Sequence, residues 1–211
     1  MSIRQNKLKQ STIVLASNNS GKLKEFQQLI SPLGFLLKPQ SNWSIGTVAE
    51  PHKTFVENAL AKARYASEQT GHAALADDSG ICVDALKGLP GVLSARYAQM
   101  NKAGKGDAAN NTYLLTQMQG IEQRTACFVA CLVFVRHACD PMPLIAQGVW
   151  WGKVAKEPLG ENGFGYDPIF WLPSFNCTAA QLSTEQKNTF SHRAIALRQL
   201  VKQLGQYGEF V

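Results

Sequence analysis

The chain has 211 residues, of which 45% are hydrophobic and 17% are charged, so it is long enough for one globular domain with a substantial core. No apolar run reaches the roughly eighteen residues of a membrane span, and the polar start lacks the pattern of a signal peptide, so we expect a cytoplasmic protein. The formal net charge of +6 suits a polyanionic partner. The lysines and arginines are scattered, which argues against a basic tail and is compatible with a local phosphate site.

The first predicted elements are a strand, a polar loop and a helix. We expect residues 1–11 to be a disordered extension and residues 12–211 to form a single domain. The apolar run 12–16 predicts a buried strand, and residues 17–21 have the composition of a turn and a helix cap. Apolar residues then recur at helical spacing as far as Ile30.

An acidic segment follows the second predicted helix. Thr54 and Glu57 match a capping box and predict a helix over residues 55–70. The apolar residues 73–76 predict a strand that runs into an acidic turn, Asp77-Asp78-Ser79-Gly80. Two carboxylates would then lie at the end of a strand, where α/β proteins often place their chemistry.

The second half of the chain predicts further helices and strands. Asp107 is the expected cap of a helix that runs to about Met118, and Ser191 is the expected cap of the last helix. Runs rich in β-branched and aromatic residues predict strands at 125–135, 144–155 and 169–172. Because strands and helices are interspersed, the chain belongs to the α/β class with a mixed sheet.

The loop after the first strand has the composition of an anion site. Its residues are Ser17, Asn18, Asn19, Ser20, Gly21 and Lys22. Their backbone N–H groups and the N-terminus of the following helix can converge on a phosphate, and Lys22 adds a positive charge. The loop is not a Walker P-loop, because Ala16 stands where that motif needs glycine and Leu23 where it needs serine or threonine. A polar helix cap with a solvated lysine is the alternative.

Other segments also carry candidate chemistry. Asp77 and Asp78 offer the hard oxygen ligands that suit Mg²⁺, and one of them could orient an attacking water, although a plain acidic turn would look the same. In the glycine-rich loop 160–168, an aromatic ring could stack on a flat ligand or anchor the loop to the core. At the start of the last helix, His192 and Arg193 could read the edge of a base, or the histidine could lie on the surface.

Five segments stand out in chain order: SNNSGKLKE, TFVENALAKA, ADDSGICVDALKGLPGVLSARYA, GFGYDPIF and SHRAIAL. Together they resemble the inosine/xanthosine triphosphate pyrophosphatase family, the Ham1-like proteins, from about Thr12 to Leu204. The resemblance implies an elongated α/β fold in which helices flank a long mixed sheet, with a nucleotide cleft between two lobes. It also implies a homodimer that hydrolyses ITP, dITP and XTP at the α–β phosphate bond to the monophosphate and pyrophosphate.

The resemblance further implies roles for individual residues. Asp78 would activate the attacking water, and Lys62 would neutralise the triphosphate. Glu50, Asp77 and Asp78 would surround Mg²⁺. The implied substrate-binding residues are Ser17, Asn18, Asn19, Ser20, Gly21, Lys22, Ser79, Phe164, Gly165, Tyr166, Asp167, Lys187, His192 and Arg193. Taken without the resemblance, Lys62 and Glu50 are ordinary solvated residues.

Two rival interpretations remain. A Maf-type pyrophosphatase, which acts on modified pyrimidine or other nucleotides and shares the general architecture, would differ in its base preference. A nucleic-acid-binding module would use the basic charge, but the chain has no RNA-binding aromatic signature, zinc finger or arginine-rich segment. In addition, the Asp77-Asp78 pair would repel phosphate without a metal. We therefore expect no nucleic acid and no membrane among the partners.

Overall fold

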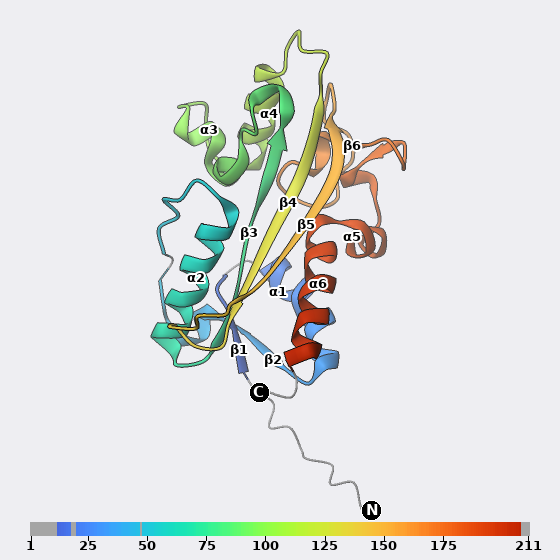
Figure 1. Cartoon of the computed structure of the whole chain (residues 1–211). Coiled ribbons are helices and arrows are strands. Elements are labelled where there is room, and N and C mark those ends of the chain that lie inside the picture. The colour runs from blue at the N-terminus through green and yellow to red at the C-terminus, as the bar shows by residue number, and fades with distance from the viewer. Residues whose placement is uncertain (1–11, 18–19, 47, 208–211) are drawn as a thin grey trace, which may run out of the picture.

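The computed structural model describes residues 12–17, 20–46 and 48–207. In this part of the chain, helices cover both faces of a seven-stranded mixed sheet (Figure 1), which confirms the predicted α/β class. The expected extension, residues 1–11, lies outside the described residues. No helix in the described ranges combines the length and the apolar composition needed to cross a membrane.

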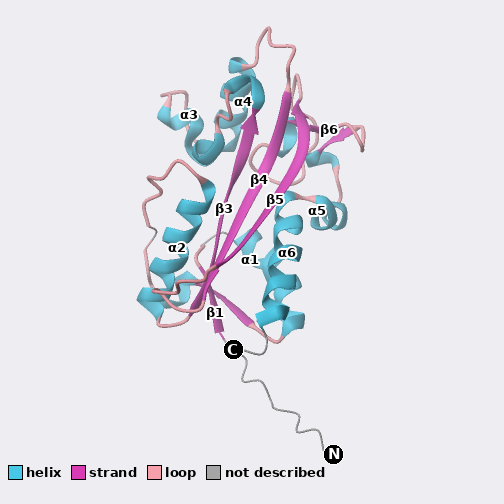
Figure 2. Ribbon diagram, in the orientation of Figure 1, coloured by secondary structure: helices cyan, strands magenta, loops and turns pink. Residues whose placement is uncertain are grey.

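The strands are β1 (Thr12–Leu15), β2 (Leu36–Pro39), β3 (Ala73–Val83), β4 (Thr125–Val135), β5 (Leu144–Val154), β6 (Phe170–Leu172) and β7 (Cys177–Thr178). Their order across the sheet is β2-β1-β3-β4-β5-β6-β7. Strand β1 is parallel to β2 and β3, and the later pairings are antiparallel. Strands β3, β4 and β5 have 11 residues each. They extend well beyond β1 and β2, which makes the molecule elongated (Figure 2).

The α-helices are α1 (Ser20–Ile30), α2 (Phe55–Thr70), α3 (Tyr97–Met100), α4 (Asp107–Gln117), α5 (Thr184–Phe190) and α6 (His192–Tyr207). Helix α2 has the predicted bounds, and the Thr54 hydroxyl oxygen accepts a hydrogen bond from the Glu57 N–H at 3.4 Å. The capping box is only half formed, because the Glu57 carboxylate accepts from the Thr54 hydroxyl instead of from a backbone N–H. The predicted cap of α6 is confirmed, since Ser191 Oγ accepts from the Ala194 N–H at 3.3 Å.

Alternating side chains of the central strands build a core on each face of the sheet. On one face, α1 and α6 pack against residues such as Leu75 and Leu132. Further along the same strands, Phe128 and Trp150 belong to a second cluster that includes Leu114 of α4. On the opposite face, the alanines of α2 pack against β1, β3 and β4, because small side chains let the helix approach the sheet closely.

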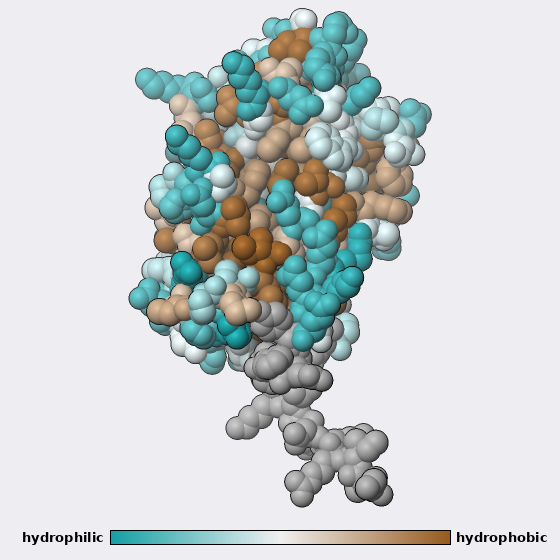
Figure 3. All heavy atoms as spheres, viewed as in Figure 1, coloured by the Kyte–Doolittle hydropathy of each residue, from teal (hydrophilic) through white to brown (hydrophobic). Residues whose placement is uncertain are grey.

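The outer side of β5 is partly open. Buried and exposed residues alternate along this strand, and Ile145 and Trp151 are exposed while Trp150 is buried. Apolar residues gather in the centre of the face shown in Figure 3, between α2 and α6. The two adjacent tryptophans therefore have different roles, and only Trp150 belongs to the core.

Two expectations about local structure are wrong. The segment Asp77-Asp78-Ser79-Gly80 is not a turn, because β3 continues through it and pairs with β4 residue by residue as far as Val83. The sequence of the acidic segment does not reveal this, since the partner strand lies about fifty residues away. Asp107 is not a helix cap either, because Gly106 occupies the cap position and Asp107 is the first helical residue. Its carboxylate accepts a hydrogen bond from the Gly165 N–H instead.

The close crossing of α6 over β5 gives a stability prediction. A Cβ at Gly148 would lie 2.0 Å from the His192 carbonyl oxygen and 2.6 Å from the Ala196 nitrogen. We expect Gly148→Ala to lower the free energy of unfolding by about 2–3 kcal/mol, because backbone atoms cannot move aside as a flexible side chain would. Urea unfolding measures the change.

Gly205→Ala is the matched control for this prediction. Gly205 lies in α6, the helix that crosses Gly148, and a Cβ at Gly205 would meet nothing within 4 Å. The substitution should raise stability by about 0.5–1 kcal/mol, the usual gain of alanine over glycine inside a helix. If Gly148→Ala were as stable as Gly205→Ala, α6 would not pack against β5 this closely.

Candidate functional site

The site is built on β3 beyond the point where β1 ends. The last contact between these strands in the described part of the chain is the Ala16 N–H to Leu75 carbonyl bond, so Asp77, Asp78 and Ser79 lie beyond the end of β1. Further along β3, the edge bonds to the segment 89–94. Successive side chains of a strand point to opposite faces. Asp77 and Ser79 therefore face α1 and α6, whereas Asp78 faces α2, as their contacts show below.

Asp77 is a buried anion held by two cations from distant parts of the chain. Its side chain is 0% exposed, and its Oδ2 lies 2.7 Å from Lys22 Nζ and 3.2 Å from Arg193 Nε. Burial alone would raise the pKa of Asp77, but the charges of Lys22 and Arg193 outweigh burial and hold the pKa far below its ordinary value. Asp77 Oδ1 has no hydrogen-bond partner among the described residues. The site thus contains an ionised oxygen that a cation or a donor would satisfy.

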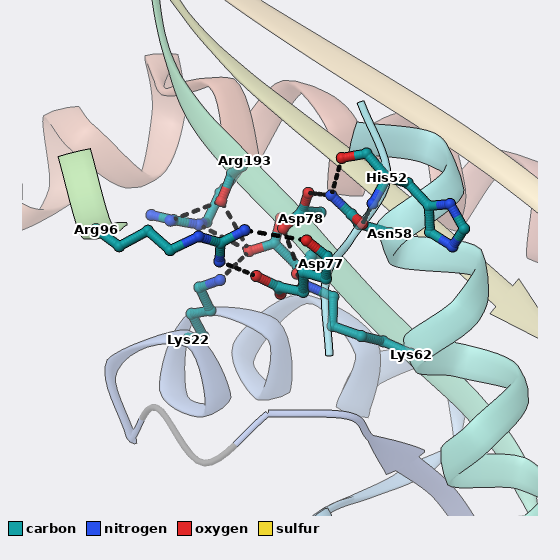
Figure 4. A network of polar contacts seen from close by, with 10 residues as sticks. Lys22, His52, Asn58, Lys62, Asp77, Asp78, Arg96 and Arg193 are labelled. Atoms are coloured by element: carbon teal, nitrogen blue, oxygen red, sulfur yellow. Dashed lines mark hydrogen bonds and ion pairs between the residues drawn. The ribbon is translucent and has the colours of Figure 1, made fainter. Parts of the chain in front are cut away.

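Asp78 lies in a different environment on the other face. Lys62 Nζ is 2.9 Å from Asp78 Oδ1, and Asn58 Nδ2 donates to Asp78 Oδ2 at 3.3 Å (Figure 4). Burial raises the pKa of Asp78, although Lys62 opposes the change. Burial also acts to lower the pKa of Lys62, but the carboxylates of Asp78 and Glu50 outweigh it and raise that pKa. A charged lysine is therefore fixed beside a carboxylate that takes up a proton more readily than usual.

Glu50 connects Lys62 to an arginine that the sequence did not single out. Glu50 Oε1 lies 2.6 Å from Lys62 Nζ, and Arg96 donates to both Glu50 Oε2 at 3.2 Å and the Glu50 carbonyl at 3.0 Å. Burial acts to raise the pKa of Glu50, but Lys62 and Arg96 outweigh it, and the pKa is lowered. Glu50 is thus an anion held between two cations. Figure 4 shows Arg96 reaching toward the same centre as Lys22 and Arg193.

Asn58 of α2 was also missed. It is buried, and it holds the backbone of His52 on both sides, accepting from the His52 N–H at 3.1 Å and donating to the His52 carbonyl at 3.3 Å. Because Asn58 also bonds Asp78, it ties the Glu50 loop to β3. Neither residue follows from local spacing, since Arg96 contacts Glu50 across 46 positions and Asn58 contacts Asp78 across 20. The only sequence signal is that both fall within segments that carry the family resemblance.

Two pockets adjoin at Lys22. The cationic pocket, of about 400 Å³, is lined by Ala16, Ser17, Lys22, Gln40, Val48, Ala49, Glu50, Lys62, Tyr65, Asp77 and Arg96. The aromatic pocket, of about 430 Å³, is lined by Lys22, Ser79, Gly80, Ser94, Ala95, Asp107, Asn110, Phe128, Phe164, Gly165, Tyr166, Asp167, His192 and Arg193. Each is within the size range of small-molecule sites. A ligand with a charged end and a flat end would match the pair.

Phe164 is the exposed ring of the aromatic pocket. Lys187 Nζ lies 4.8 Å and the Arg193 guanidinium carbon 5.0 Å from the centre of this ring, which places two cations against one aromatic side chain. The Phe164 N–H donates to Asp167 Oδ2 at 2.8 Å, and Lys187 forms an ion pair with the same oxygen. Tyr166 instead anchors the loop, because it is buried and its hydroxyl donates to the Ser94 carbonyl at 2.8 Å.

His192 lies at the back of the aromatic pocket and not on the surface. Its side chain is buried, and its ring is stacked on Phe128 with centroids 4.8 Å apart. Its Nδ1 has no hydrogen-bond partner among the described residues. Burial is the main cause that lowers the pKa of His192 well below 6.5, so the imidazole is neutral near pH 7.

The remaining predicted residues divide into three groups. Ser17 lines the cationic pocket, and Ser79 accepts from Arg193 at 3.0 Å while donating to Asp77 at 3.1 Å. Ser20 and Gly21 form the start of α1. The predicted Asn18 and Asn19 lie outside the described residues.

The three carboxylates of the site have the chemistry that a magnesium ion requires. Glu50, Asp77 and Asp78 supply hard oxygen donors, and Asp77 Oδ1 is ionised and without a partner in the described part of the chain. Lys62 bridges Glu50 and Asp78, and among the described residues no three metal-binding side chains are gathered into a ready cage. Mg²⁺ does not require such a cage, because it commonly binds one or two carboxylates together with water and substrate phosphates.

Comparison with known proteins identifies the family of the chain. A profile of the Ham1 family matches residues 13–203. The dITP/XTP pyrophosphatases of Bordetella parapertussis and Ralstonia nicotianae are 57% and 58% identical over 192 residues, which is 91% of this chain and 90% and 96% of those proteins. A HAM1 protein structure from Coxiella burnetii is similar with a TM-score of 0.87 and 46% identity, covering 93% of this chain and 99% of that chain.

A further solved structure from Mycobacterium abscessus, a nucleoside-triphosphatase / dITP/XTP pyrophosphatase, has a TM-score of 0.74 and 40% identity. The match covers 92% of this chain and 99% of that chain. Both the sequence and the fold similarities therefore extend over nearly the full length.

The neutral state of His192 predicts a pH dependence of stability. Below pH 6.5 the unfolded chain binds a proton at this histidine while the folded chain, whose His192 pKa is depressed, does not. The free energy of unfolding should therefore fall as pH drops from 6.5, with a slope of at most about 1.4 kcal/mol per pH unit from this group.

Urea unfolding at pH 7.5 and pH 5.5 isolates the effect when wild type is compared with His192→Phe. The phenylalanine ring retains the stacking on Phe128 but cannot bind a proton. The variant should lose less stability than wild type between the two pH values. Equal losses in both proteins would show that His192 is not held neutral.

Proposed function

Because the chain belongs to the Ham1 family, we propose that it is a nucleoside triphosphate pyrophosphatase that hydrolyses ITP, dITP and XTP. The products are the nucleoside monophosphate and pyrophosphate, so the enzyme removes non-standard purine nucleotides from the pool. The observation that carries the proposal is the junction of the cationic pocket and the aromatic pocket at Lys22. A triphosphate fits the first, and a purine base fits the second.

The cationic pocket has the charges that a triphosphate needs. Lys22, Lys62 and Arg96 line it, and Arg193 lies beside Asp77 at its border. Phosphoryl transfer requires little from a protein beyond positioning and charge neutralisation, and fixed cations in a partly buried site supply both. The start of α1 adds backbone N–H groups at the same place.

Asp78 is the better candidate for the group that takes a proton from the attacking water. Its pKa is raised by burial, whereas the pKa of the neighbouring Asp77 is held low by Lys22 and Arg193. A carboxylate with a raised pKa is a stronger base than one stabilised by two cations. Lys62 keeps Asp78 oriented through its 2.9 Å contact.

We assign Mg²⁺ as the cofactor, with Glu50, Asp77 and Asp78 as the residues that would hold it. When bound, the ion would supply charge neutralisation at the phosphate oxygens. The unpartnered Asp77 Oδ1 and the hard-donor chemistry of the three carboxylates support this assignment.

The aromatic pocket accounts for a preference for oxo-purines. Phe164 offers a stacking surface, and Lys187 and Arg193 lie against it. Both cations can only donate hydrogen bonds, so they suit the 6-oxo group of hypoxanthine and xanthine. The 6-amino group of adenine would meet these donors with a donor of its own, which leaves buried polar groups unpaired. Guanine has the same 6-oxo group as hypoxanthine, so the sparing of GTP requires that its 2-amino group meet no acceptor or no space.

A homodimer in the cytoplasm completes the proposal. The homodimer rests on the family resemblance, and the cytoplasmic location is the expectation drawn from the sequence above. Size-exclusion chromatography with light scattering would measure the oligomeric state. Neither property affects the assignment of the reaction.

Product analysis tests the function directly. The purified chain is incubated with Mg²⁺ and, separately, with ITP, XTP, dITP, GTP, ATP and UTP, and the products are separated by ion-exchange chromatography. We expect IMP, XMP and dIMP together with pyrophosphate, while ATP and GTP are largely spared, and we expect chelation of the metal to stop the reaction. Cleavage of UTP alone would favour the Maf-type interpretation, and release of single phosphates would contradict cleavage at the α–β bond.

Asp78→Asn tests the assignment of the base. The amide has nearly the same shape as the carboxylate but cannot accept the proton, so kcat should fall by at least about a hundredfold. Glu57→Gln, which changes an exposed carboxylate at the start of α2, should leave kcat unchanged. Near-normal turnover by a folded Asp78→Asn protein would remove Asp78 from the catalytic role.

A further inference from the structure

Two side chains of α4 hold a single glycine of the loop that carries Phe164. Asp107 Oδ2 accepts from the Gly165 N–H at 2.7 Å, and Asn111 Nδ2 donates to the Gly165 carbonyl at 3.0 Å. Asp107 and Asn111 are four residues apart, so they lie on one side of the helix, one turn from each other. Both backbone hydrogen-bonding groups of Gly165 are therefore bound by α4.

The conformation of Gly165 explains why side chains must hold it. Its φ of 64° lies in the left-handed region that favours glycine, and the residue is outside the helices and strands of the described chain. Its N–H and carbonyl are thus not bound in a regular ladder. Without Asp107 and Asn111 these groups would bond to water, and the loop would have more freedom to move.

Helix α4 is itself anchored to the rest of the protein. Asn110 accepts from the Ala98 N–H at 2.9 Å and donates to the Ala95 carbonyl at 3.2 Å, which joins the helix to the preceding segment. Leu114 is fully buried in the hydrophobic cluster that contains Phe128 and Trp150. Because the helix is anchored in this way, two of its side chains can hold a bound loop in one position.

Gly165 immediately follows Phe164, the exposed ring of the aromatic pocket. Phe164 is bound through its N–H to Asp167, and Tyr166 is bound through its hydroxyl to Ser94. These bonds fix the loop from one side, and α4 fixes the peptide that follows the Phe164 ring from the other. Asp107 and Gly165 also line the aromatic pocket, whereas the cationic pocket contains neither of them.

We propose that Asp107 and Asn111 are positioning residues that set the placement of the Phe164 ring and thereby determine specificity for the base. The inference rests on the proposed pyrophosphatase function. A shift of the ring would change how the base stacks and how its edge meets Lys187 and Arg193, and small displacements of a positioned group have large effects on binding and selectivity. The triphosphate should be bound as before, because its pocket is held by other residues.

Substitutions at Asp107 separate the hydrogen bond from the charge. Asp107→Ala removes the acceptor for the Gly165 N–H, and we expect it to raise the KM for ITP about tenfold with little change in kcat. Asp107→Asn retains an oxygen that can accept the same bond, so it should behave nearly as wild type. Because Asp107 is exposed, neither change should prevent folding.

At Asn111 the conservative exchange should be harmful, whereas at Asp107 it should be tolerated. Asn111→Asp has the same shape but cannot donate, so it sets an acceptor against the Gly165 carbonyl and should impair ITP binding. Asn111→Ala should impair it in the same way without adding a buried charge. In each impaired variant the preference for ITP over ATP should also fall, which loss of stability alone would not produce.

Two controls make the test decisive. Thr116→Ala removes an exposed hydroxyl that donates to the Thr112 carbonyl within α4, and it should leave KM and selectivity unchanged. Inorganic tripolyphosphate, which lacks a base, should inhibit wild type and all variants with the same constant.

The outcomes distinguish the two levels of the proposal. If wild type does not hydrolyse ITP, the proposed function fails. If wild type prefers ITP, but Asp107→Ala and Asn111→Ala have wild-type KM and selectivity, only the positioning role fails. Equal weakening of ITP and tripolyphosphate would also overturn it, because the effect would then not be confined to the base.

Discussion

The placement of a charged carboxylate with no exposed side-chain surface at Asp77 is the constraint on which the site depends. A buried anion is tolerated only when opposite charges and donors surround it. Lys22 comes from α1 near the start of the described chain, and Arg193 comes from the first turn of α6 near its end. The need to neutralise Asp77 therefore brings α1, β3 and α6 together at one point of the sheet.

The same ion pairs place the two pockets next to each other. Lys22 lines both pockets, and Arg193 reaches from Asp77 to the ring of Phe164. Each cation thus faces a structural anion on one side and a pocket on the other. A bound polyanion would share these cations with Asp77, because a buried carboxylate that lost both partners would be left as an uncompensated charge.

The sequence predicted those features that depend on neighbours in the chain. The start of α2 followed from Thr54 and Glu57, and the start of α6 followed from Ser191, because capping bonds span only a few residues. The acidic turn was wrong, because Asp77 and Asp78 are held in a strand by β4, which lies far away in sequence.

Long-range contacts also explain which residues were missed. Arg96 meets Glu50 across 46 positions, and Asp107 meets Gly165 across 58. No local pattern records such a pair, and each residue alone has an ordinary structural explanation. The family resemblance named many residues of the two pockets but neither Arg96, which lines the cationic pocket, nor Asp107, which holds the loop of the aromatic pocket.

The correction of the acidic turn changes how the two aspartates can act. In a turn, adjacent carboxylates would share one environment and repel each other. On a strand they emerge on opposite faces, where Asp77 is enclosed by Lys22 and Arg193 and Asp78 is desolvated beside Lys62. These surroundings move their pKa values in opposite directions, downward for Asp77 and upward for Asp78. Two neighbouring carboxylates with separated pKa values can divide one task, since one remains an anion while the other exchanges a proton. Strand alternation, a property of the backbone alone, thus gives two identical side chains different chemistry.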